Sequence, residues 1–400
     1  MTGGRRSLRV GRRELGDGCL ILGAILLVAG APLTPPWMSA GMILAGLGWL
    51  LSLPPPGARW ALVAGLGVTA LIAAAGLATW FDLDRPVKFA QYQVAWVAMF
   101  FTRIGLADPR WRRAALMALL VTVGAATLLA CLQYVIGYEP KLRPWRIDTG
   151  GQRQWVMASG FAPHTITFGF IAGLVVILFV CDRTLGPTLR ITAIILGALC
   201  LAMSGCRGAL LGLLAALAII VLLSKDRVAW WLAGLVTMVA VMITWVAWRQ
   251  PARIAELLAG ENDRWLIWAA AIDAITQRPW TGHGGLDGYR QAIAGVDFRA
   301  LSGPMTSPNP HNSWLALAAF HGAPVAAAHL ALLGAVLLEV RRTAVALALP
   351  LALIAYWLVA GCFQSLAAHA LPSLAFFAFL GLAWPTRSGG EGSLPVPDLR

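Results

Sequence analysis

Long apolar runs, separated by short polar segments, extend along almost the whole chain. Each run holds roughly 17 to 25 residues, the length that a helix needs to cross the hydrocarbon layer of a bilayer. The runs begin near Cys19, Trp37, Trp60, Phe89, Ala114, Val156, Ile191, Ala209, Val228, Ser313, Thr343 and Ala367. This pattern predicts an all-α, polytopic membrane protein with about 12 transmembrane helices.

The spacing of these runs divides the chain into seven segments. They are a cytoplasmic basic tail (1–18), transmembrane helices 1 to 5 (19–138), a basic outer loop (139–155), transmembrane helices 6 to 9 (156–248), one large outer-face loop (249–312), transmembrane helices 10 to 12 (313–385) and a disordered cytoplasmic tail (386–400). Apolar residues recur at helical spacing between Trp265 and Ile275, so the large loop is expected to contain short helices.

The overall composition agrees with a membrane protein. Of the 400 residues, 59% are hydrophobic and only 12% are charged. Together with a mean hydropathy of +0.73, these values exclude an ordinary soluble globule. The six cysteines never form a CxxC pair, so neither a disulfide framework nor a metal site is predicted.

Membrane topology explains the net charge of +13. Lys and Arg cluster at alternate span ends, as they do on the cytoplasmic side of membrane proteins. This alternation places both termini in the cytoplasm, and it removes the reason to expect a nucleic-acid partner. The alternative is that the first apolar stretch, 19–29, belongs to a cleaved signal peptide, but losing this span would break the alternation.

Two predicted outer segments carry more cations than this rule favours. Residues 139–155 contain four basic residues, and residues 249–312 contain six arginines, among them Arg264. Arg207 lies in a very short outer turn between two spans. Cations that are kept where topology disfavours them indicate an anionic partner.

Both Arg207 and Arg264 also have a structural interpretation. Arg207 can snorkel from a helix end, and Arg264 can pair at the surface with Glu261 or Asp263. The polarity of the helices favours a functional role. A helix that begins on the outer side directs its free N–H groups and its positive dipole end outward, which makes a ready anion site.

Polar side chains recur where predicted helices begin on the outer side. His311 and Asn312 precede the run that starts at Ser313, and His164 precedes another run. Residues 313–338 contain no Asp, Glu, Lys or Arg, so they are predicted to cross the membrane as one long helix and to place His311 at the membrane–water boundary. If these helix starts, the arginines and the imidazole surround one cavity, that cavity suits a polyphosphate with a nearby hydroxyl.

A glycine-rich turn, Thr281-Gly282-His283-Gly284-Gly285, lies within the large outer loop. Its glycines permit a close approach of two backbones. The segment lacks the strand–turn–helix context of a nucleotide-binding loop, so it is not interpreted as one.

Several motifs follow one another in a fixed order. They are Gly160-Phe161-Ala162-Pro163-His164, Ser204-x-x-Arg207-Gly208, Arg264-x-x-x-Trp268, Pro279-Trp280-x-Gly282-x-Gly284, and His311-Asn312-x-x-Leu315 with Gly322 downstream. In this order and topology they resemble the O-antigen ligase and polymerase superfamily, whose members are integral membrane glycosyltransferases that act on polyprenyl-pyrophosphate-linked glycans. The resemblance covers roughly residues 155–340, and the first five spans match only in general character.

The sequence departs from the family pattern at two places. Cys206 stands where a Ser often precedes the Arg, and Ala323-Pro324 follows Gly322 where a second Gly is usual. Neither departure removes a proposed catalytic group.

The resemblance implies a role for each polar residue. His311, whose ordinary pKa lies near 6.5, would be the general base that removes the proton of the acceptor hydroxyl. Arg207 and Arg264, with Arg153 and Arg143 as further candidates, would bind the pyrophosphate without a metal or another cofactor. Four residues are candidates for supporting roles, namely Asn312, His164, Ser204 and His283.

The histidines have structural interpretations as well. An interfacial His such as His311 can simply be bonded to a loop carbonyl. His321, His329 and His369, which lie in or near the spans, are interpreted as hydrogen-bonded structural groups.

These inferences predict an inverting glycosyltransferase of the bacterial inner membrane, with its active site on the periplasmic face and a lipid-linked glycan as donor. The acceptor is lipid A-core in a ligase, another repeat unit in a polymerase, and Ser or Thr in a protein O-oligosaccharyltransferase. The size of the chain and its single large outer loop favour the ligase.

Two other functions remain open from the sequence. Asp82-Leu83-Asp84 could hold a divalent cation on a pyrophosphate, although Arg85 and Lys88 follow and would neutralise the pair. A transporter or flippase also suits about 12 spans. However, no internal repeat is visible, and nearly all charge lies at the membrane boundaries.

Overall fold

The computed structural model describes residues 3–33, 35–52, 59–78, 95–136, 158–223, 234, 264–296, 309–343 and 347–384. Within these ranges every regular element is a helix, so the all-α prediction is confirmed there. The longer helices are α1 (Gly3–Ala29), α2 (Pro35–Ser52), α3 (Arg59–Ala78), α6 (Pro109–Ile136), α7 (Thr165–Cys181), α8 (Pro187–Ser204), α9 (Arg207–Leu223), α15 (Ala323–Thr343) and α16 (Ala348–Phe363). The shorter ones are α5 (Val97–Gly105), α12 (Arg264–Gln277), α13 (Leu286–Ala292), α14 (Ser313–His321), the 3₁₀-helix η3 (Leu366–Ala368) and α17 (Ala370–Ala383).

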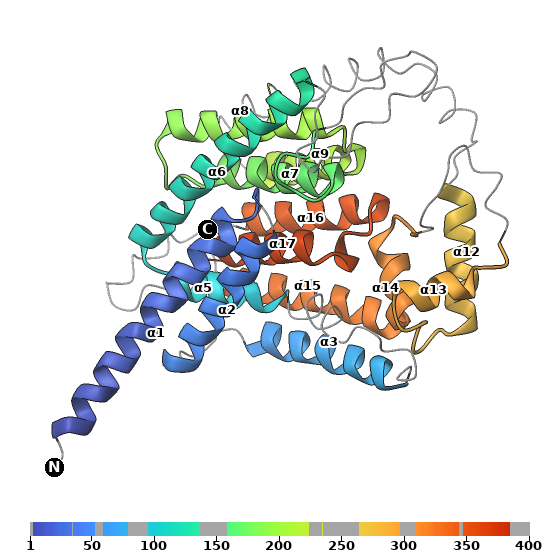
Figure 1. The fold of residues 1–400 in the computed structure, drawn as a ribbon, viewed down its shortest axis with the longest axis horizontal. Helices are drawn as coiled ribbons and strands as arrows, with labels where there is room; N and C mark the ends of the chain where they lie inside the picture. Colours follow the sequence, from blue (N-terminus) through green and yellow to red (C-terminus); the bar gives the residue numbers. More distant parts are fainter. Residues whose placement is uncertain are drawn as a thin grey trace, which may run out of the picture.

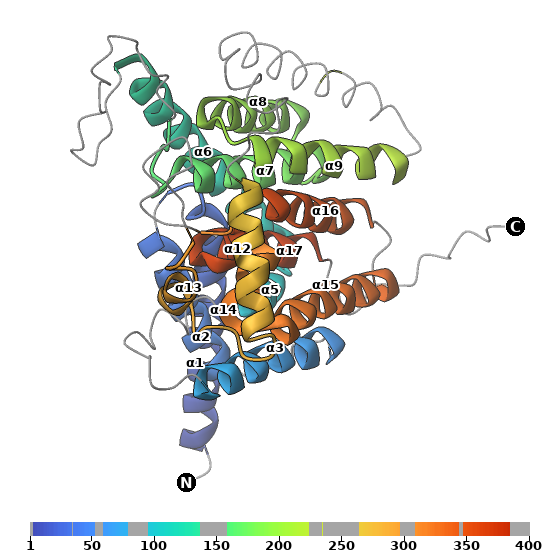
Figure 2. The same cartoon turned by 90° about the vertical axis from the view of Figure 1, so that its right-hand side faces the viewer.

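The long helices form a bundle with α7, α16 and α17 at its centre (Figure 1). α9 packs against α7 and α16, α8 packs against α6 and α7, and α15 packs against α3. α12 has a different orientation, because it runs across the ends of α9, α16 and α15 (Figure 2). One end of the bundle is therefore covered by α12, α13 and α14.

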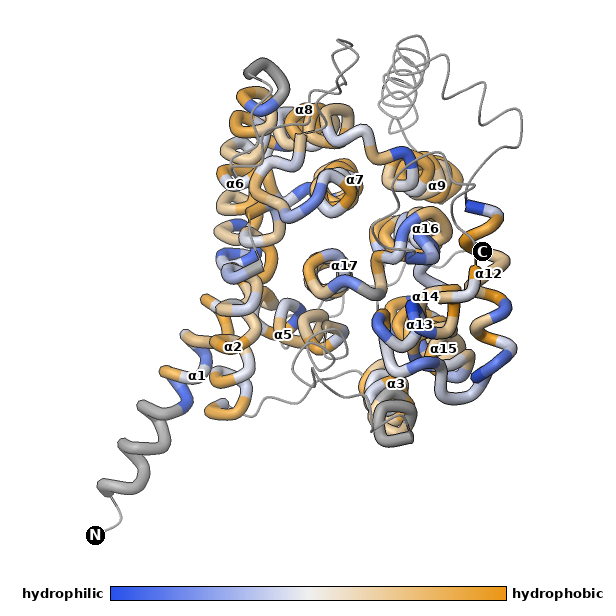
Figure 3. Tube along the Cα trace, turned by 45° about the vertical axis from the view of Figure 1, so that its right-hand side comes forward, coloured by the Kyte–Doolittle hydropathy of each residue, from blue (hydrophilic) through white to orange (hydrophobic). Residues whose placement is uncertain are grey.

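The helices of the bundle are composed largely of apolar residues (Figure 3). Leu128 on α6 is 74% exposed and Leu222 on α9 is 79% exposed. Large apolar side chains on several helices face outward while others fill a continuous core. A soluble monomer rarely exposes apolar surface on this scale, so these faces are suited to lipid contact.

Three of the described helices are long and apolar enough to cross a membrane. These stretches are Pro109–Gln133, Pro187–Ser204 and Ala323–Arg342. Shorter apolar helices accompany them, including α7, α9, α16 and α17. The chain is a membrane protein by this criterion, whereas the count of about 12 spans stays a prediction. The predicted span that begins at Val228 lies outside the described residues.

The prediction of one unbroken helix over 313–338 was wrong. The structure divides this stretch into α14 and α15 at Gly322, whose φ is +92°. A Cβ at Gly322 would lie 2.2 Å from the carbonyl oxygen of Trp280. The hydropathy pattern could not show this break, because hydropathy does not report the backbone conformation of Gly322 or its contact with a distant loop. With nine residues, α14 is only about 14 Å long and cannot cross a bilayer.

The predictions for the tails and the outer loops can be compared with the structure only in part. α1 begins at Gly3, so the described part of the basic tail continues the first apolar run as a helix. α12 and α13 confirm that the 249–312 loop contains short helices. The 139–155 loop and the 386–400 tail lie outside the described residues.

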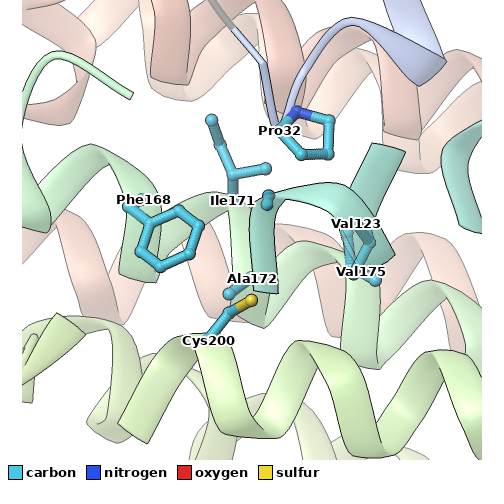
Figure 4. Close-up of a pocket in the computed structure, with 8 residues that line it drawn as sticks. Pro32, Val123, Phe168, Ile171, Ala172, Val175 and Cys200 are labelled. Carbon is cyan, nitrogen blue, oxygen red and sulfur yellow. The ribbon is translucent and has the colours of Figure 1, made fainter. Parts of the chain in front are cut away.

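A small apolar cavity lies between α6, α7 and α8 (Figure 4). Its volume is about 10 Å³, which is about the space that one water requires. The lining residues are Pro32, Val123, Ala126, Phe168, Ile171, Ala172, Val175 and Cys200. This lining offers almost no polar atoms to hold a water or a ligand, so the cavity is a gap in helix packing.

Candidate active site

His311 lies in the loop that leads into α14, and its backbone adopts an unusual conformation. Its φ is +48°, and among the described residues no other residue except glycine has a positive φ. A non-glycine residue in this left-handed region is uncommon, and such conformations cluster at functional sites. The surrounding hydrogen bonds must therefore hold His311 in place.

Asn312 begins α14 as its N-cap. Its side-chain oxygen accepts hydrogen bonds from the backbone N–H groups of Trp314 at 2.9 Å and Leu315 at 3.1 Å. An N-cap of this kind typically contributes about 1 kcal/mol. The supporting role predicted for Asn312 thus has a definite structural form, because the cap fixes the start of the helix immediately after His311.

Three further contacts tie the His311 loop to its neighbours. Trp268 on α12 donates from Nε1 to the Pro310 carbonyl at 2.9 Å. Ser313 donates from Oγ to the Gln364 carbonyl at 2.7 Å, and Ser365 donates to the side chain of Asn309. The loop is therefore held between α12 and the segment that joins α16 to α17.

The ring of His311 is partly buried. Burial lowers the pKa of His311 and the positive charge of Arg264 lowers it further, while the nearby Gln364 side chain raises it. The net effect is a pKa below the ordinary value, so the imidazole is neutral at neutral pH. A neutral imidazole is the form that can accept a proton.

Arg264 is linked by charge to both Arg207 and His311. Arg264 is the first residue of α12 and is partly buried, whereas Arg207 is the first residue of α9 and is exposed. Burial lowers the pKa of Arg264, the charge of Arg207 lowers it further, and Cys206 opposes both. Arg264 in turn lowers the pKa of His311, so it lies within electrostatic reach of each of the other two predicted groups.

Ser204 shapes the turn that precedes Arg207. Its Oγ donates to the Leu201 carbonyl at 2.7 Å and accepts from the Cys206 N–H at 3.2 Å. Gly205 completes the turn with a φ of +61°. The buried Ser204 hydroxyl thus both donates and accepts a hydrogen bond within the turn. Its contribution is to place Arg207.

His164 is the N-cap residue of α7, and a buried glutamine holds the loop before it. The Gln133 side chain accepts from the N–H groups of Ser159 at 3.0 Å and Gly160 at 2.9 Å, and it donates to the Gly160 carbonyl at 3.2 Å. Gln133 therefore fixes the path of the chain into α7 and with it the position of His164.

His369 joins the site, although it was interpreted as a structural group. It is the N-cap residue of α17. Burial lowers its pKa, and the nearby His164 and His311 lower it further. By its accessible surface His369 is exposed, so its ring is only partly desolvated. Its place at the start of an outer-side helix, like that of His164, was the sequence signal that could have found it.

His283 lies in a different environment. The ring is buried, and its Nε2 lies 2.8 Å from the Ala274 carbonyl on α12, while its backbone N–H donates to the Ala319 carbonyl on α14 at 3.0 Å. In this position His283 joins α12 to α14, which makes it a structural support at a distance from the ring of His311.

The glycine-rich turn reinforces this connection. The N–H of Gly285 donates to the Phe320 carbonyl at 3.1 Å, and the N–H of Ala323 donates to the Pro279 carbonyl at 2.8 Å. At Gly282, where φ is +64°, a Cβ would lie 2.5 Å from the backbone of His321. The predicted close backbone approach is confirmed, and residues 279–285 are called the interhelical clamp below.

Arg143, Arg153 and the Asp82–Asp84 pair lie outside the described residues. His329 donates from Nδ1 to the Val325 carbonyl at 3.3 Å, which agrees with its interpretation as a hydrogen-bonded structural group. The site that the structure brings together consists of Arg207, Arg264, His311, His164, His369 and Gln364.

The central part of the chain matches a known family. Residues 192–330 match the family model described as O-antigen ligase, Wzy_C. Over this segment the chain is similar to O-antigen ligases. No curated protein matches the sequence. The match confirms the resemblance to the O-antigen ligase superfamily, and the matched segment includes Arg207, Arg264 and His311. His164, Gln364 and His369 lie outside it, so they are grouped with these three residues by the structure alone.

Proposed function

We propose that this protein is a metal-independent, inverting glycosyltransferase of the O-antigen ligase type. The donor is a glycan on polyprenyl (undecaprenyl) pyrophosphate, and the acceptor is a hydroxyl of lipid A-core on the periplasmic face of the inner membrane. The observation that supports the proposal is that Arg264 lies within electrostatic reach of both His311 and Arg207, although the three residues come from three separate helix starts.

The proposed reaction forms one bond and breaks one. The acceptor oxygen attacks the anomeric carbon while His311 accepts the hydroxyl proton. The bond between the anomeric carbon and the pyrophosphate oxygen breaks, and its electron pair leaves with the polyprenyl pyrophosphate. Attack from the side opposite the leaving group inverts the anomeric centre. General-base help of this kind is worth roughly 10²- to 10⁴-fold in rate.

The two arginines support the departure of the pyrophosphate. A guanidinium can bind phosphate oxygens through two parallel hydrogen bonds, and partial burial of Arg264 strengthens its interaction with an anion. Both arginines stand at helix N-termini, where free backbone N–H groups also favour an anion. Arg143 and Arg153 are proposed as further contacts to the same group.

The orientation of the site is also part of the proposal. The charge alternation predicts the starts of α7, α9 and α17 on the outer side, and these starts carry His164, Arg207 and His369. Their meeting at one end of the bundle supports a periplasmic site with both termini cytoplasmic.

The test uses purified full-length protein in lipid nanodiscs with undecaprenyl-pyrophosphate glycan as donor. Lipid A-core, a free glycan repeat unit and a Ser/Thr peptide are supplied separately, each in EDTA. We expect an inverted product on lipid A-core. Product on the repeat unit alone would indicate a polymerase, and product on the peptide alone would indicate a protein O-oligosaccharyltransferase.

Other outcomes would overturn the proposal itself. Loss of transfer in EDTA with recovery on adding Mg²⁺ would favour a metal site at Asp82 and Asp84. Movement of the labelled donor across proteoliposomes without any transfer would favour a flippase. Full activity in His311→Ala would show that His311 is not the general base. Arg278 is exposed, so Arg278→Ala serves as the control for Arg264→Ala.

A further inference from the structure

Two tryptophan side chains stand at the start of α12, where the helix leaves Arg264. Trp265 is 66% exposed, whereas Trp268 is partly buried. Their rings meet edge to face, with 5.3 Å between the ring centroids and an angle of 79° between the ring planes. These two rings are called the aromatic pair below.

Trp268 attaches the aromatic pair to the candidate active site. Its Nε1 donates to the Pro310 carbonyl at 2.9 Å, and Pro310 directly precedes His311 in the chain. Trp265 directly follows Arg264. The aromatic pair is therefore continuous with the residues proposed to hold the pyrophosphate and to remove the acceptor proton.

The exposed face of α12 points away from the bundle. Ala270, Ala271 and Ala274 pack in one apolar cluster with side chains of α13 and α14. Successive residues of a helix are rotated by about 100°, so Trp265 and Ile272 share the face opposite these alanines. Because α12 runs across the ends of the long helices (Figure 2), this opposite face looks outward from the end of the bundle.

This direction bears on what the exposed rings contact. Tryptophan is common where a membrane protein meets the lipid head groups. The surfaces of this bundle that suit lipid lie along the sides of the long helices, where Leu128 and Leu222 are exposed. The face of α12 that carries Trp265 lies across the helix ends instead, and this placement favours a hydrated partner over lipid.

A sugar is a hydrated partner that fits an exposed indole ring. A pyranose carries hydroxyl groups at its rim and C–H groups on its faces, and these hydrogens have a partial positive charge. The face of an aromatic ring has a partial negative charge, so stacking combines electrostatic attraction with burial of apolar area. Tryptophan has only two side-chain torsions, so it loses little entropy when it binds a ligand.

We propose that the aromatic pair, with Trp265 as its exposed surface, binds the glycan of the lipid-linked donor by stacking against a sugar beyond the one that is linked to the pyrophosphate. This proposal rests on the proposed transferase function. The donor is favoured over the acceptor because Trp265 adjoins Arg264, which is proposed to bind the pyrophosphate that carries this glycan. The polyprenyl tail stays in the lipid, so the sugars extend outward over α12.

The experiment measures the binding of two ligands to the full-length protein in nanodiscs. One is undecaprenyl pyrophosphate that carries a glycan of several sugars, and the other is undecaprenyl pyrophosphate without sugar. In Trp265→Ala we expect Kd for the glycan-bearing ligand to rise roughly 3- to 10-fold, the range for one aromatic contact. Kd for the sugar-free ligand should not change. In the transfer assay KM for the donor should rise, while KM for lipid A-core stays the same.

Two further substitutions separate stacking from simple apolar contact. Trp265→Phe keeps an aromatic face and should retain most of the affinity for the glycan. Trp265→Leu keeps an apolar side chain without a π face and should behave like Trp265→Ala. If Trp265→Ala fails to fold, as judged by thermal unfolding, the comparison of Phe with Leu decides the question.

Trp280→Ala is the matched control. The Trp280 side chain is 77% exposed, but it lies beyond the other end of α12, about 20 Å from Trp265 along the helix. We expect no change in Kd for either ligand when this ring is removed. An equal loss of glycan affinity in Trp280→Ala and Trp265→Ala would overturn the proposal.

Three other results would also overturn it. Equal weakening of both ligands in Trp265→Ala would show that the ring acts on the pyrophosphate or on the tail. Wild-type glycan affinity in Trp265→Leu would show that the residue needs only an apolar side chain, as at a lipid interface. A rise in KM for lipid A-core alone would assign the aromatic pair to the acceptor.

Failure of this proposal can be distinguished from failure of the function, because binding does not require transfer. If the wild-type protein transfers the glycan while Trp265→Ala binds the donor normally, only the role of the aromatic pair is wrong. If the wild-type protein binds the glycan through Trp265 and transfers it to none of the acceptors, the transferase function is wrong.

Discussion

Charged side chains have different electrostatic environments at the two ends of the helical bundle. α7 connects these ends, because it begins beside His164 and ends beside Asp182. At the Asp182 end, Arg112 binds the aspartate and also donates to the Leu382 carbonyl at 2.8 Å. Arg103 lies over the ring of Trp384, with 4.3 Å between the guanidinium carbon and the ring centroid.

The same contrast appears in the helix dipoles. At the Asp182 end, Arg341 and Arg342 lie in the last turn of α15, where the negative end of the dipole stabilises cations. At the other end, Arg207 and Arg264 are the first residues of their helices, where the positive end of the dipole opposes them. Cations therefore stabilise the fold at one end, and at the other they are kept against local electrostatics.

This difference indicates which end carries the function. A residue that breaks a local rule in a folded protein often marks a functional site. At the Arg207 end the charges that act on Arg264, His311 and His369 include neighbouring cations and histidines. A pyrophosphate bound there would turn this mutual repulsion into attraction.

Replacement of His311 should produce the largest effect. In His311→Ala we expect transfer to fall by roughly 10²- to 10⁴-fold because the general base is lost. Thermal unfolding should change little, since the cap at Asn312 remains. The measurement is the initial rate of glycan transfer, and a loss of activity that merely follows loss of folded protein would contradict this expectation.

Removal of Arg264 should come next. Arg264→Ala is expected to lower kcat by roughly 10²- to 10³-fold, as for other groups that stabilise developing negative charge. The charge of Arg264 lowers the pKa of His311, so its removal should raise that pKa and move the acid limb of the pH profile to higher pH. Arg278→Ala, on the same loop, should do neither.

Arg112→Ala should affect stability and leave the chemistry intact. It would leave the carboxylate of Asp182, which is only 2% exposed, without its main counter-ion. The expected cost is about 1–3 kcal/mol, below the range for fully buried pairs because Arg112 itself is 25% exposed. Transfer per folded molecule should equal that of the wild type, and a large fall in kcat would break the comparison between the ends.

The same pair predicts a pH dependence of stability. Burial alone would raise the pKa of Asp182, but Arg112 and Thr184 outweigh it and the net pKa is lowered. The pair therefore contributes stability above the unfolded pKa of about 4, and this contribution is lost as the pH falls through the lowered pKa of the folded state. Asp182→Asn should remove this acid-side change in unfolding temperature.

Glu339→Gln should have the smallest effect on transfer. Glu339 on α15 accepts from the backbone N–H of Trp60 at 3.1 Å, a bond that a glutamine oxygen can keep, but the amide loses the negative charge that acts on the buried guanidinium of Arg103. We expect a loss of about 1–3 kcal/mol in stability and no change in transfer. A change in the pH profile of transfer would show that the two ends are coupled.

The sequence allowed the all-α fold class and the similarity to the O-antigen ligase superfamily to be predicted. Apolar runs located the described long helices, because a helix in lipid must be apolar over a known length. Arg207, Arg264 and His311 were selected as site candidates because cations and an imidazole at predicted outer helix starts are unusual, and their roles stay predictions. These predictions depended on properties that are local in the sequence.

What could not be predicted depends on contacts between distant residues. Gln364 at the end of an apolar run has no signal of its own, and its carbonyl accepts from Ser313 only because the α16–α17 connection meets the loop before α14. The close approach of Gly322 to Trp280 depends on distant residues in the same way, although Pro324 is a local signal for the helix break. His369 was placed among the structural histidines because its neighbours His164 and His311 lie far away in the chain.

The interhelical clamp has a consequence for how this site can evolve. It joins the C-terminal ends of α12 and α14 by main-chain hydrogen bonds, and the opposite ends of these two helices carry Arg264 and His311. Main-chain bonds do not depend on the identity of side chains. Exposed side chains of this segment can therefore change without breaking these bonds, while Gly282 and Gly322 keep the two backbones in close contact.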